Sequence, residues 1–165
     1  MRNFMKQRYF STFVFFFFIA CTDCYAQSDT HSLKEEWGKL KAELIKRNSL
    51  ITDLISNPKI ESKFSEAVKV IHTTAKSYND TLIKITIIDS IRLVQIQDLE
   101  FSLLIMMAEL GDKIQQQHLF ENDSQIKTAA KNVDHAVSQV IKQAHDFNYW
   151  INEQQKLSLI FTTDL

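Results

Sequence analysis

Residues 33–55 read LKEEWGKLKAELIKRNSLITDLI, and this segment decides the fold. Its apolar residues alternate in steps of four and three; they are Leu33, Trp37, Leu40, Leu44, Ile51 and Leu54. This spacing gives an α-helix one apolar face, which must pack against a partner to be stable. Arg47 stands where the seven-residue rhythm calls for another apolar residue. The segment therefore predicts a long packed helix with a charged residue in its apolar seam.

The ends of this first helix carry local signals. Ser32 followed by Glu35 has the form of a capping box, which predicts that the helix begins there. Asn57-Pro58 predicts its end, because a residue before proline is pushed out of helical geometry. Proline also suits the first position of a new helix. A connection this short predicts an antiparallel second helix.

The second helix is predicted from one apolar face that extends into the low eighties. Its members are Ile60, Phe64, Ala67 or Val68, Ile71, Ala75 and Tyr78. The stretch 82–96 is ambiguous: its β-branched residues partly alternate, as in a β-hairpin, but helical spacing also runs through it. Helix is favoured, because an isolated hairpin is only marginally stable.

The later chain predicts two more helices. One is capped by Asp98, ends at Gly111-Asp112, and is expected to be the most deeply buried helix. Its expected face is Leu99, Leu103, Met106 and Leu110. The last helix carries the longest seam: Ile126, Ala130, Val133, Val137, Val140, Ala144, Phe147 and Ile151. A seam of fours and threes over several heptads is typical of bundle packing. We therefore expect an all-α, antiparallel up-and-down four-helix bundle with long first and last helices.

Composition supports this class and excludes one kind of partner. The 165-residue chain has two glycines and one proline, fewer than the many turns of a strand-rich fold require. Its formal net charge is −1, without a basic block. Nucleic-acid binding depends on basic groups that neutralise phosphates, so we expect no nucleic-acid partner.

Residues 1–26 have the three parts of a secretory signal peptide. Basic residues precede the apolar run 13–20, and small and polar residues follow it. The run is too short for the roughly 20 residues of a spanning helix. Cleavage after Ala26 would release a soluble protein; Cys21, in a loose lipobox, could instead be lipidated; or the leader could be retained as an anchor. We expect an exported protein, periplasmic or membrane-associated in the cell envelope, with residues 27–165 as its domain.

Two stretches resemble a known family. The run 46–55, which begins nine residues after Trp37, resembles the Arg-Arg-x-Asp-Leu-Ile-Pro-x-Leu-Val element of the LemA family. The run 144–148, followed by Ile151, resembles that family's Ala-Arg-x-x-Tyr-Asn-x-x-Val element. Thr52 and Phe147 replace the family's proline and tyrosine, so the chain resembles a divergent member. The resemblance implies an envelope-associated antiparallel helical bundle without an established activity.

The sequence predicts no catalytic, cofactor-binding or metal-binding residues, and no cofactor. A di-metal site in a helical bundle needs Glu-x-x-His on two helices. No histidine has a glutamate three residues before it; the five are His31, His72, His118, His135 and His145. Two isolated glycines cannot form a phosphate-binding loop. Cys21-x-x-Cys24 lies in the leader and is not expected to form a redox or metal site.

These observations favour a non-enzymatic envelope protein with a scaffold or protein-interaction role. The alternative is an exported sensor or small-ligand-binding bundle with an apolar pocket between its helices. The expected partner is another envelope protein, bound through exposed faces of the first and last helices. Side chains flanking the seams there are Lys41, Glu43, Lys142 and Asp146, all expected to be solvated. Membrane association would come from a lipidated Cys21 or a retained leader.

Overall fold

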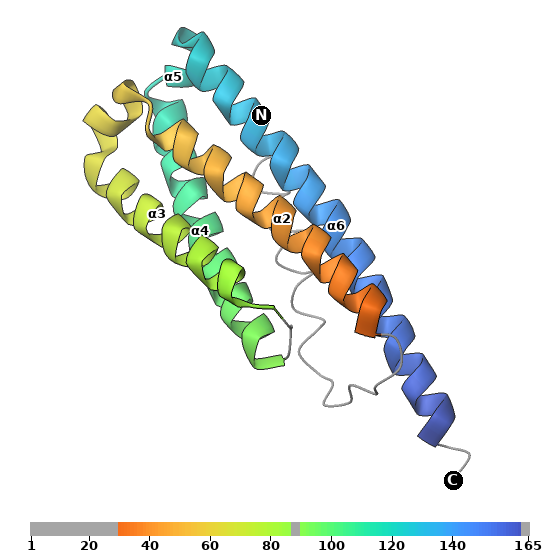
Figure 1. Ribbon diagram of the computed structural model, residues 1–165. Helices are drawn as coiled ribbons and strands as arrows, with labels where there is room; N and C mark the ends of the chain where they lie inside the picture. Colours follow the sequence, from red (N-terminus) through yellow and green to blue (C-terminus); the bar gives the residue numbers. More distant parts are fainter. Residues whose placement is uncertain (1–29, 87–89, 163–165) are drawn as a thin grey trace.

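The computed structural model describes the backbone of residues 30–86 and 90–162, and the side chains of residues 33–86 and 91–149. Within these ranges the chain is all-helical, as predicted. The described helices are α2 (Thr30–Ile55), α3 (Pro58–Lys84), α4 (Ser90–Gln116), α5 (Leu119–Asn122) and α6 (Ser124–Thr162). They pack together as a helical bundle (Figure 1). The predicted leader, residues 1–26, lies outside the described residues.

Helix α2 buries the face that its sequence predicted. Its buried apolar residues are Trp37, Leu40, Leu44, Ile51, Leu54 and Ile55. The helix already includes Thr30, so the prediction that it begins at a Ser32 cap is wrong. The predicted Asn57-Pro58 boundary is confirmed: the Asn57 side chain accepts a hydrogen bond from the Lys59 backbone N–H at 3.0 Å. Pro58 occupies the first turn of α3.

Helix α3 resolves most of the ambiguity over residues 82–96. It buries Ile60, Val68, Ile71, Ala75, Tyr78 and Leu82, and it continues to Lys84. Phe64 departs from helical geometry, with φ −132° and ψ 35°, which kinks the helix. After a short connection, helix resumes at Ser90. The hairpin alternative is therefore wrong for the described part of this stretch, and residues 87–89 lie outside it.

Helix α4 is longer than predicted at both ends. Asp98 lies inside the helix rather than at its cap, and Gly111-Asp112 do not end it. Glycine weakens a helix by only about 1 kcal/mol relative to alanine, and tertiary packing readily overrides that. Here Leu110 and Ile114 are both buried, so their packing carries the helix past Gly111. The chain leaves α4 near His118, which has left-handed φ 55° and ψ 23°.

Asp123 connects the start of α6 to the start of α3. Its carboxylate accepts hydrogen bonds from the backbone N–H groups of Gln125 (2.9 Å) and Ile126 (3.1 Å), as an N-cap does. The Lys59 ammonium lies 2.6 Å from the same carboxylate. The Lys59 hydrogen bond, followed by the backbone bond from Ile126, lowers the pKa of Asp123 below its ordinary value. The beginnings of α3 and α6 therefore lie at the same end of the molecule.

Helix α2 lies between α3 and α6 and packs most extensively against α6 (Figure 1). The α6 side of this contact is the predicted seam: Ile126, Val133, Val137, Val140, Ala144 and Phe147 are buried, and Ala130 is half-buried. The side chain of Ile151, the last residue of that seam, lies outside the described residues. The rings of Trp37 and Phe147 meet with centroids 5.9 Å apart. Among the described elements, the backbone of α4 comes within 8 Å of α3 and α5 only. In the part of the chain that is described, no helix combines the length and apolarity needed to cross a membrane.

Candidate functional site

A charged pair lies inside the helical core. Arg47 on α2 is 0 % exposed and Glu100 on α4 is 3 % exposed. Arg47 Nη1 donates to Glu100 Oε1, and Arg47 Nη2 donates to Glu100 Oε2 at 2.6 Å. This two-bond arrangement matches the planar fork of a guanidinium to a carboxylate. Arg47, the charged residue in the apolar seam of α2, therefore forms a specific contact with α4.

Asparagines extend this pair to a third helix. The Asn48 side-chain oxygen accepts hydrogen bonds from Arg47 Nε (3.2 Å) and Nη2 (2.8 Å). Asn48 Nδ2 donates in turn to Asn79 Oδ1 on α3 at 2.9 Å. We call Arg47, Asn48 and Glu100, which are buried, and Asn79, which is half-buried, the buried polar network. Because buried polar groups are costly unless hydrogen-bonded, the network favours one relative placement of α2, α3 and α4.

Tyr78 packs against this network without completing it. Its ring centroid lies 5.9 Å from Arg47 Cζ, within the range of a cation–π contact. The Tyr78 hydroxyl is buried and has no hydrogen-bond partner among the described residues. Burial first, and then the nearby Glu100 carboxylate, raise the pKa of Tyr78 well above 10.0. The hydroxyl therefore stays neutral in the folded protein at physiological pH.

The replacement Tyr78→Phe should leave stability unchanged or raise it at neutral pH, because it removes a buried hydroxyl that makes no hydrogen bond. The neutral phenol stabilises the fold fully below the unfolded pKa of 10.0. That contribution is lost as pH rises above this value, because only the unfolded chain then ionises. Urea denaturation between pH 7 and 11 should show a smaller alkaline loss for Tyr78→Phe than for the wild type. Tyr149→Phe, at an exposed position, is the matched control; equal losses in all three proteins would contradict the prediction.

The residues predicted to contact a partner differ in their surroundings. Lys142 is exposed, as expected, but Lys41, Glu43 and Asp146 are only half-exposed. Lys41 Nζ donates to the Ile85 carbonyl at 3.2 Å, and Trp37 Nε1 donates to the same oxygen at 3.5 Å. The expectation that Lys41 is a freely solvated flank of the seam is therefore wrong. It helps to hold the end of α3 against the start of α2.

The histidines do not gather into a site. Among residues 33–86 and 91–149, no group of three or more His, Cys, Asp or Glu side chains is placed to hold a metal ion. His72, His118, His135 and His145 are exposed, and His118 Nδ1 lies 3.0 Å from Glu121 on the surface. The side chain of His31 lies outside the described residues. The absence of metal remains a prediction.

A narrow crevice lies between α2, α4, α5 and α6. It is almost wholly apolar and has a volume of about 10 Å³. Its lining residues are Leu54, Met107, Leu110, Gly111, Ile114, Phe120, Ala130 and Val133. Such a volume corresponds to about one water molecule, whereas small-molecule sites are typically hundreds of Å³. The crevice therefore offers no room for an organic ligand.

The outer face of α4 carries exposed large apolar side chains. Val94 is 46 % exposed, Phe101 44 % and Ile105 41 %. With the exposed Asp98 and half-buried Ala108, they follow steps of four and three. We call Val94, Phe101 and Ile105 the α4 outer stripe. The opposite face of α4 is buried in the core through Ile96, Leu103, Met107 and Leu110. Since α4 is buried on that face and exposed on the other, the expectation that this helix is the most deeply buried is wrong.

The signal for this second face was present in the sequence. A helix that is apolar nearly all round is either enclosed on every side or apolar on two separate faces. Only the placement of α4 at the edge of the bundle, near α3 and α5, decides between these two cases.

Searches against protein-family models, curated proteins and solved structures found no match to this chain.

Proposed function

We propose that this chain is a LemA-like, non-enzymatic helical bundle of the cell envelope that binds another envelope protein. We propose further that α2, α3, α4 and α6 form an antiparallel up-and-down four-helix bundle. The sequence of the leader supports export, and the resemblance of residues 46–55 and 144–151 to the LemA elements supports the family. The sequence alone placed the partner on exposed faces of the first and last helices; we propose instead that the α4 outer stripe is the interaction surface.

The stripe has the pattern of a surface that receives a helix. Its steps of four and three match the seam that one amphipathic helix offers to another. Three large apolar side chains, each more than two-fifths exposed, lie along one helix. Clustered apolar exposure of this kind commonly marks an interaction site in soluble proteins. This observation carries the proposal.

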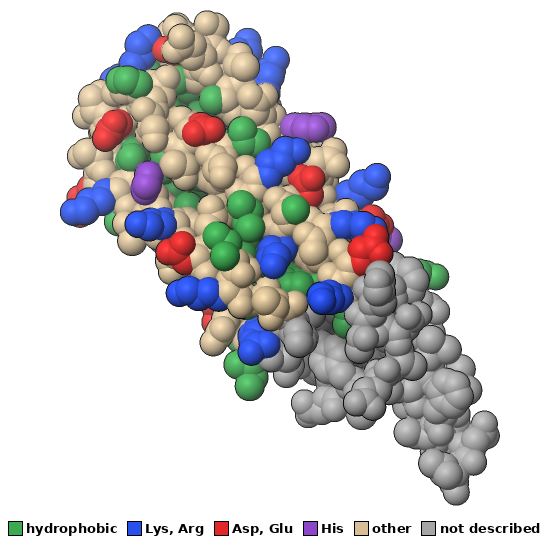
Figure 2. All heavy atoms as spheres, in the orientation of Figure 1, with side chains coloured by type: hydrophobic (Ala, Val, Ile, Leu, Met, Phe, Trp, Pro, Cys, Tyr) green, Lys and Arg blue, Asp and Glu red, His purple; other side chains and the backbone are tan. Residues whose placement is uncertain are grey.

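Charge narrows the kind of partner. Asp98 lies between Val94 and Phe101 in the stripe and is exposed. An apolar partner surface would leave this carboxylate without a counter-charge, whereas a lysine or arginine opposite it would form an ion pair. Figure 2 shows the face over α2 and α3, behind which α4 lies, and there acidic and basic side chains are mixed. The proposed partner is therefore an amphipathic helix with a basic residue at the centre of its apolar face.

Replacing Phe101 and Ile105 by serine should abolish capture of this partner without unfolding the protein. The test is cross-linking in intact cells, followed by purification of the chain and identification of what it captures. Val70→Ser is the matched control, because Val70 is an apolar residue on α3 with 48 % exposure. Asp98→Lys should also weaken capture, by placing like charges opposite each other.

Two results would contradict the proposed function. One is unchanged capture by the Phe101→Ser/Ile105→Ser protein when its thermal melt matches that of the wild type. The other is recovery of a small molecule with the purified wild-type protein and of no protein partner. The second result would instead support the ligand-binding alternative.

A further inference from the structure

The two most exposed isoleucines among the described side chains lie at one end of the bundle. Ile83 is 63 % exposed and stands one residue before the end of α3; Ile91 is 72 % exposed and stands one residue after the start of α4. Exposed lysine and arginine side chains follow each of them directly, at Lys84 and Arg92. We call these four residues the bundle tip. Ile91 lies three residues before Val94 on the same helix, so the bundle tip adjoins the α4 outer stripe.

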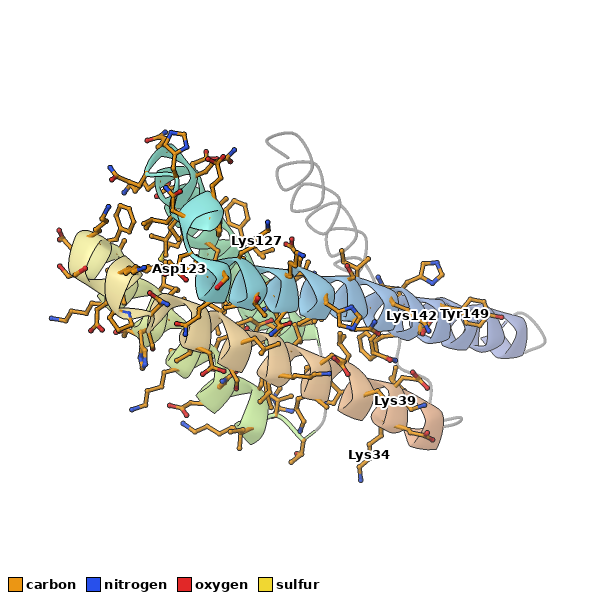
Figure 3. All side chains as sticks on the ribbon, turned by 90° about the horizontal axis from the view of Figure 1, so that it is seen from above. Lys34, Lys39, Asp123, Lys127, Lys142 and Tyr149 are labelled. Carbon is orange, nitrogen blue, oxygen red and sulfur yellow. The ribbon has the colours of Figure 1, made fainter. Side chains whose placement is uncertain are left out.

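The beginning of α2 lies at this same end. The hydrogen bonds from Trp37 and Lys41 to the Ile85 carbonyl bring the first turns of α2 against the end of α3. Figure 3 shows Lys34 projecting outward from the start of α2, at the end of the molecule opposite Asp123. Residues 1–29, which contain the predicted leader and Cys21, are therefore joined to the domain beside the bundle tip.

The charges at this end favour a negatively charged surface. Lys34, Lys84 and Arg92 are exposed cations. On α2, Lys39 Nζ lies 3.0 Å from Glu35 and 2.6 Å from Glu36, and on α3 the exposed Asp80 stands one turn before Lys84. Together with two protruding isoleucines, this arrangement is that of a surface that enters the headgroup layer of a membrane.

We infer that the bundle tip contacts an anionic phospholipid bilayer. Ile83 and Ile91 enter the interfacial layer, while Lys34, Lys84 and Arg92 bind lipid phosphates. One weak membrane signal gives only marginal attachment, whereas an N-terminal attachment and a basic apolar patch together hold a protein firmly. The inference shares the envelope location with the proposed function but does not depend on a protein partner.

The first experiment places a polarity-sensitive fluorophore on the full chain at Ile91→Cys, with Cys21 and Cys24 replaced by serine. The labelled protein is mixed with vesicles of phosphatidylcholine, with or without phosphatidylglycerol. On the anionic vesicles, the Ile91→Cys probe should shift to the blue and be quenched by a lipid-borne quencher. The same probe at Val70→Cys, an exposed position on α3 more than three turns before the bundle tip, is the control and should show neither change.

The second experiment removes the charges. Lys84→Gln with Arg92→Gln should weaken binding to anionic vesicles by about tenfold or more, because each cation near an anionic surface contributes substantially to binding. Lys127→Gln with Lys131→Gln removes the same charge near the start of α6, at the opposite end, and should leave binding unchanged. Far-ultraviolet circular dichroism verifies that every variant is folded.

Three results would overturn the inference. The first is vesicle binding without a spectral change at position 91, which would show attachment through the leader alone. The second is an equal change at positions 91 and 70. The third is a concentration-dependent shift at position 91 without vesicles, which would show that a second copy of the chain covers the tip. Because none of these measurements involves the partner of the α4 outer stripe, they can fail independently of the proposed function.

Discussion

Replacement of Arg47 by methionine is expected to lower the free energy of unfolding by about 3–5 kcal/mol, because it leaves the Glu100 carboxylate buried without its counter-charge. Arg47 is 0 % exposed and Glu100 3 % exposed, so water cannot take over the lost hydrogen bonds. Small domains are stable by only about 5–15 kcal/mol, so this loss is a large fraction of the total. Urea denaturation of the full chain at pH 7 measures it.

The double replacement distinguishes the net contribution of the ion pair to the free energy of unfolding from the loss caused by leaving one charge unpaired. Arg47→Met with Glu100→Leu removes both charges and should recover most of the lost stability, since apolar substitutes for a buried ion pair are often neutral or stabilising. Lys46→Met is the matched control, because the Lys46 side chain is 59 % exposed and its nearest acid, Glu43, lies 3.7 Å away. Its effect should be under about 1 kcal/mol.

Recovery in the double variant would also show what the network contributes. If stability returns but the folded protein loses its sharp thermal transition, the charges select the placement of α2, α3 and α4 rather than stabilise it. If the double variant is as unstable as Arg47→Met, the pair itself is a major stabilising interaction. A loss below about 1 kcal/mol for Arg47→Met alone would contradict the burial of the pair.

The sequence predicted those parts of the fold that local periodicity controls. The face of α6 follows from unbroken steps of four and three, and that of α2 follows from the same steps interrupted only at Arg47. Asn57-Pro58 follows from backbone geometry that proline imposes on its neighbour. The same reasoning failed at Asp98 and Gly111. Capping and breaking signals there are worth about 1 kcal/mol each, less than the packing of the buried residues around them.

The candidate sites were less accessible from the sequence, because each depends on which helices are neighbours. Arg47 was recognisable as an irregularity in a seam, but its partner Glu100 lies 53 residues away on another helix. Phe101 and Ile105 belong to a run that is apolar on several sides, so only the position of α4 in the bundle shows which side is exposed. The bundle tip required the hydrogen bonds that place Ile85 beside α2.

Introducing aspartate at Leu44 or Val140 is expected to unfold the domain. Both residues are 0 % exposed and lie on α2 and α6, the pair of helices with the most extensive contact. An unpaired carboxylate in that interface would have to be buried without a counter-charge or hydrogen bonds, at a cost comparable to the whole stability of a small domain. Far-ultraviolet circular dichroism of residues 27–165 should show loss of helix at 25 °C.

A graded series makes this prediction quantitative. Leu44→Ala should lower the free energy of unfolding by about 2–5 kcal/mol, the usual range for truncating a buried leucine. Ala42→Asp places the same charge two residues away at an exposed position and should leave the helix content unchanged. If Leu44→Asp kept full helix content and a wild-type melting temperature, the α2–α6 seam would not be the core of the domain. The ordering Ala42→Asp, Leu44→Ala, Leu44→Asp therefore compares a charge outside the seam with lost packing and a buried charge at a single position of the seam.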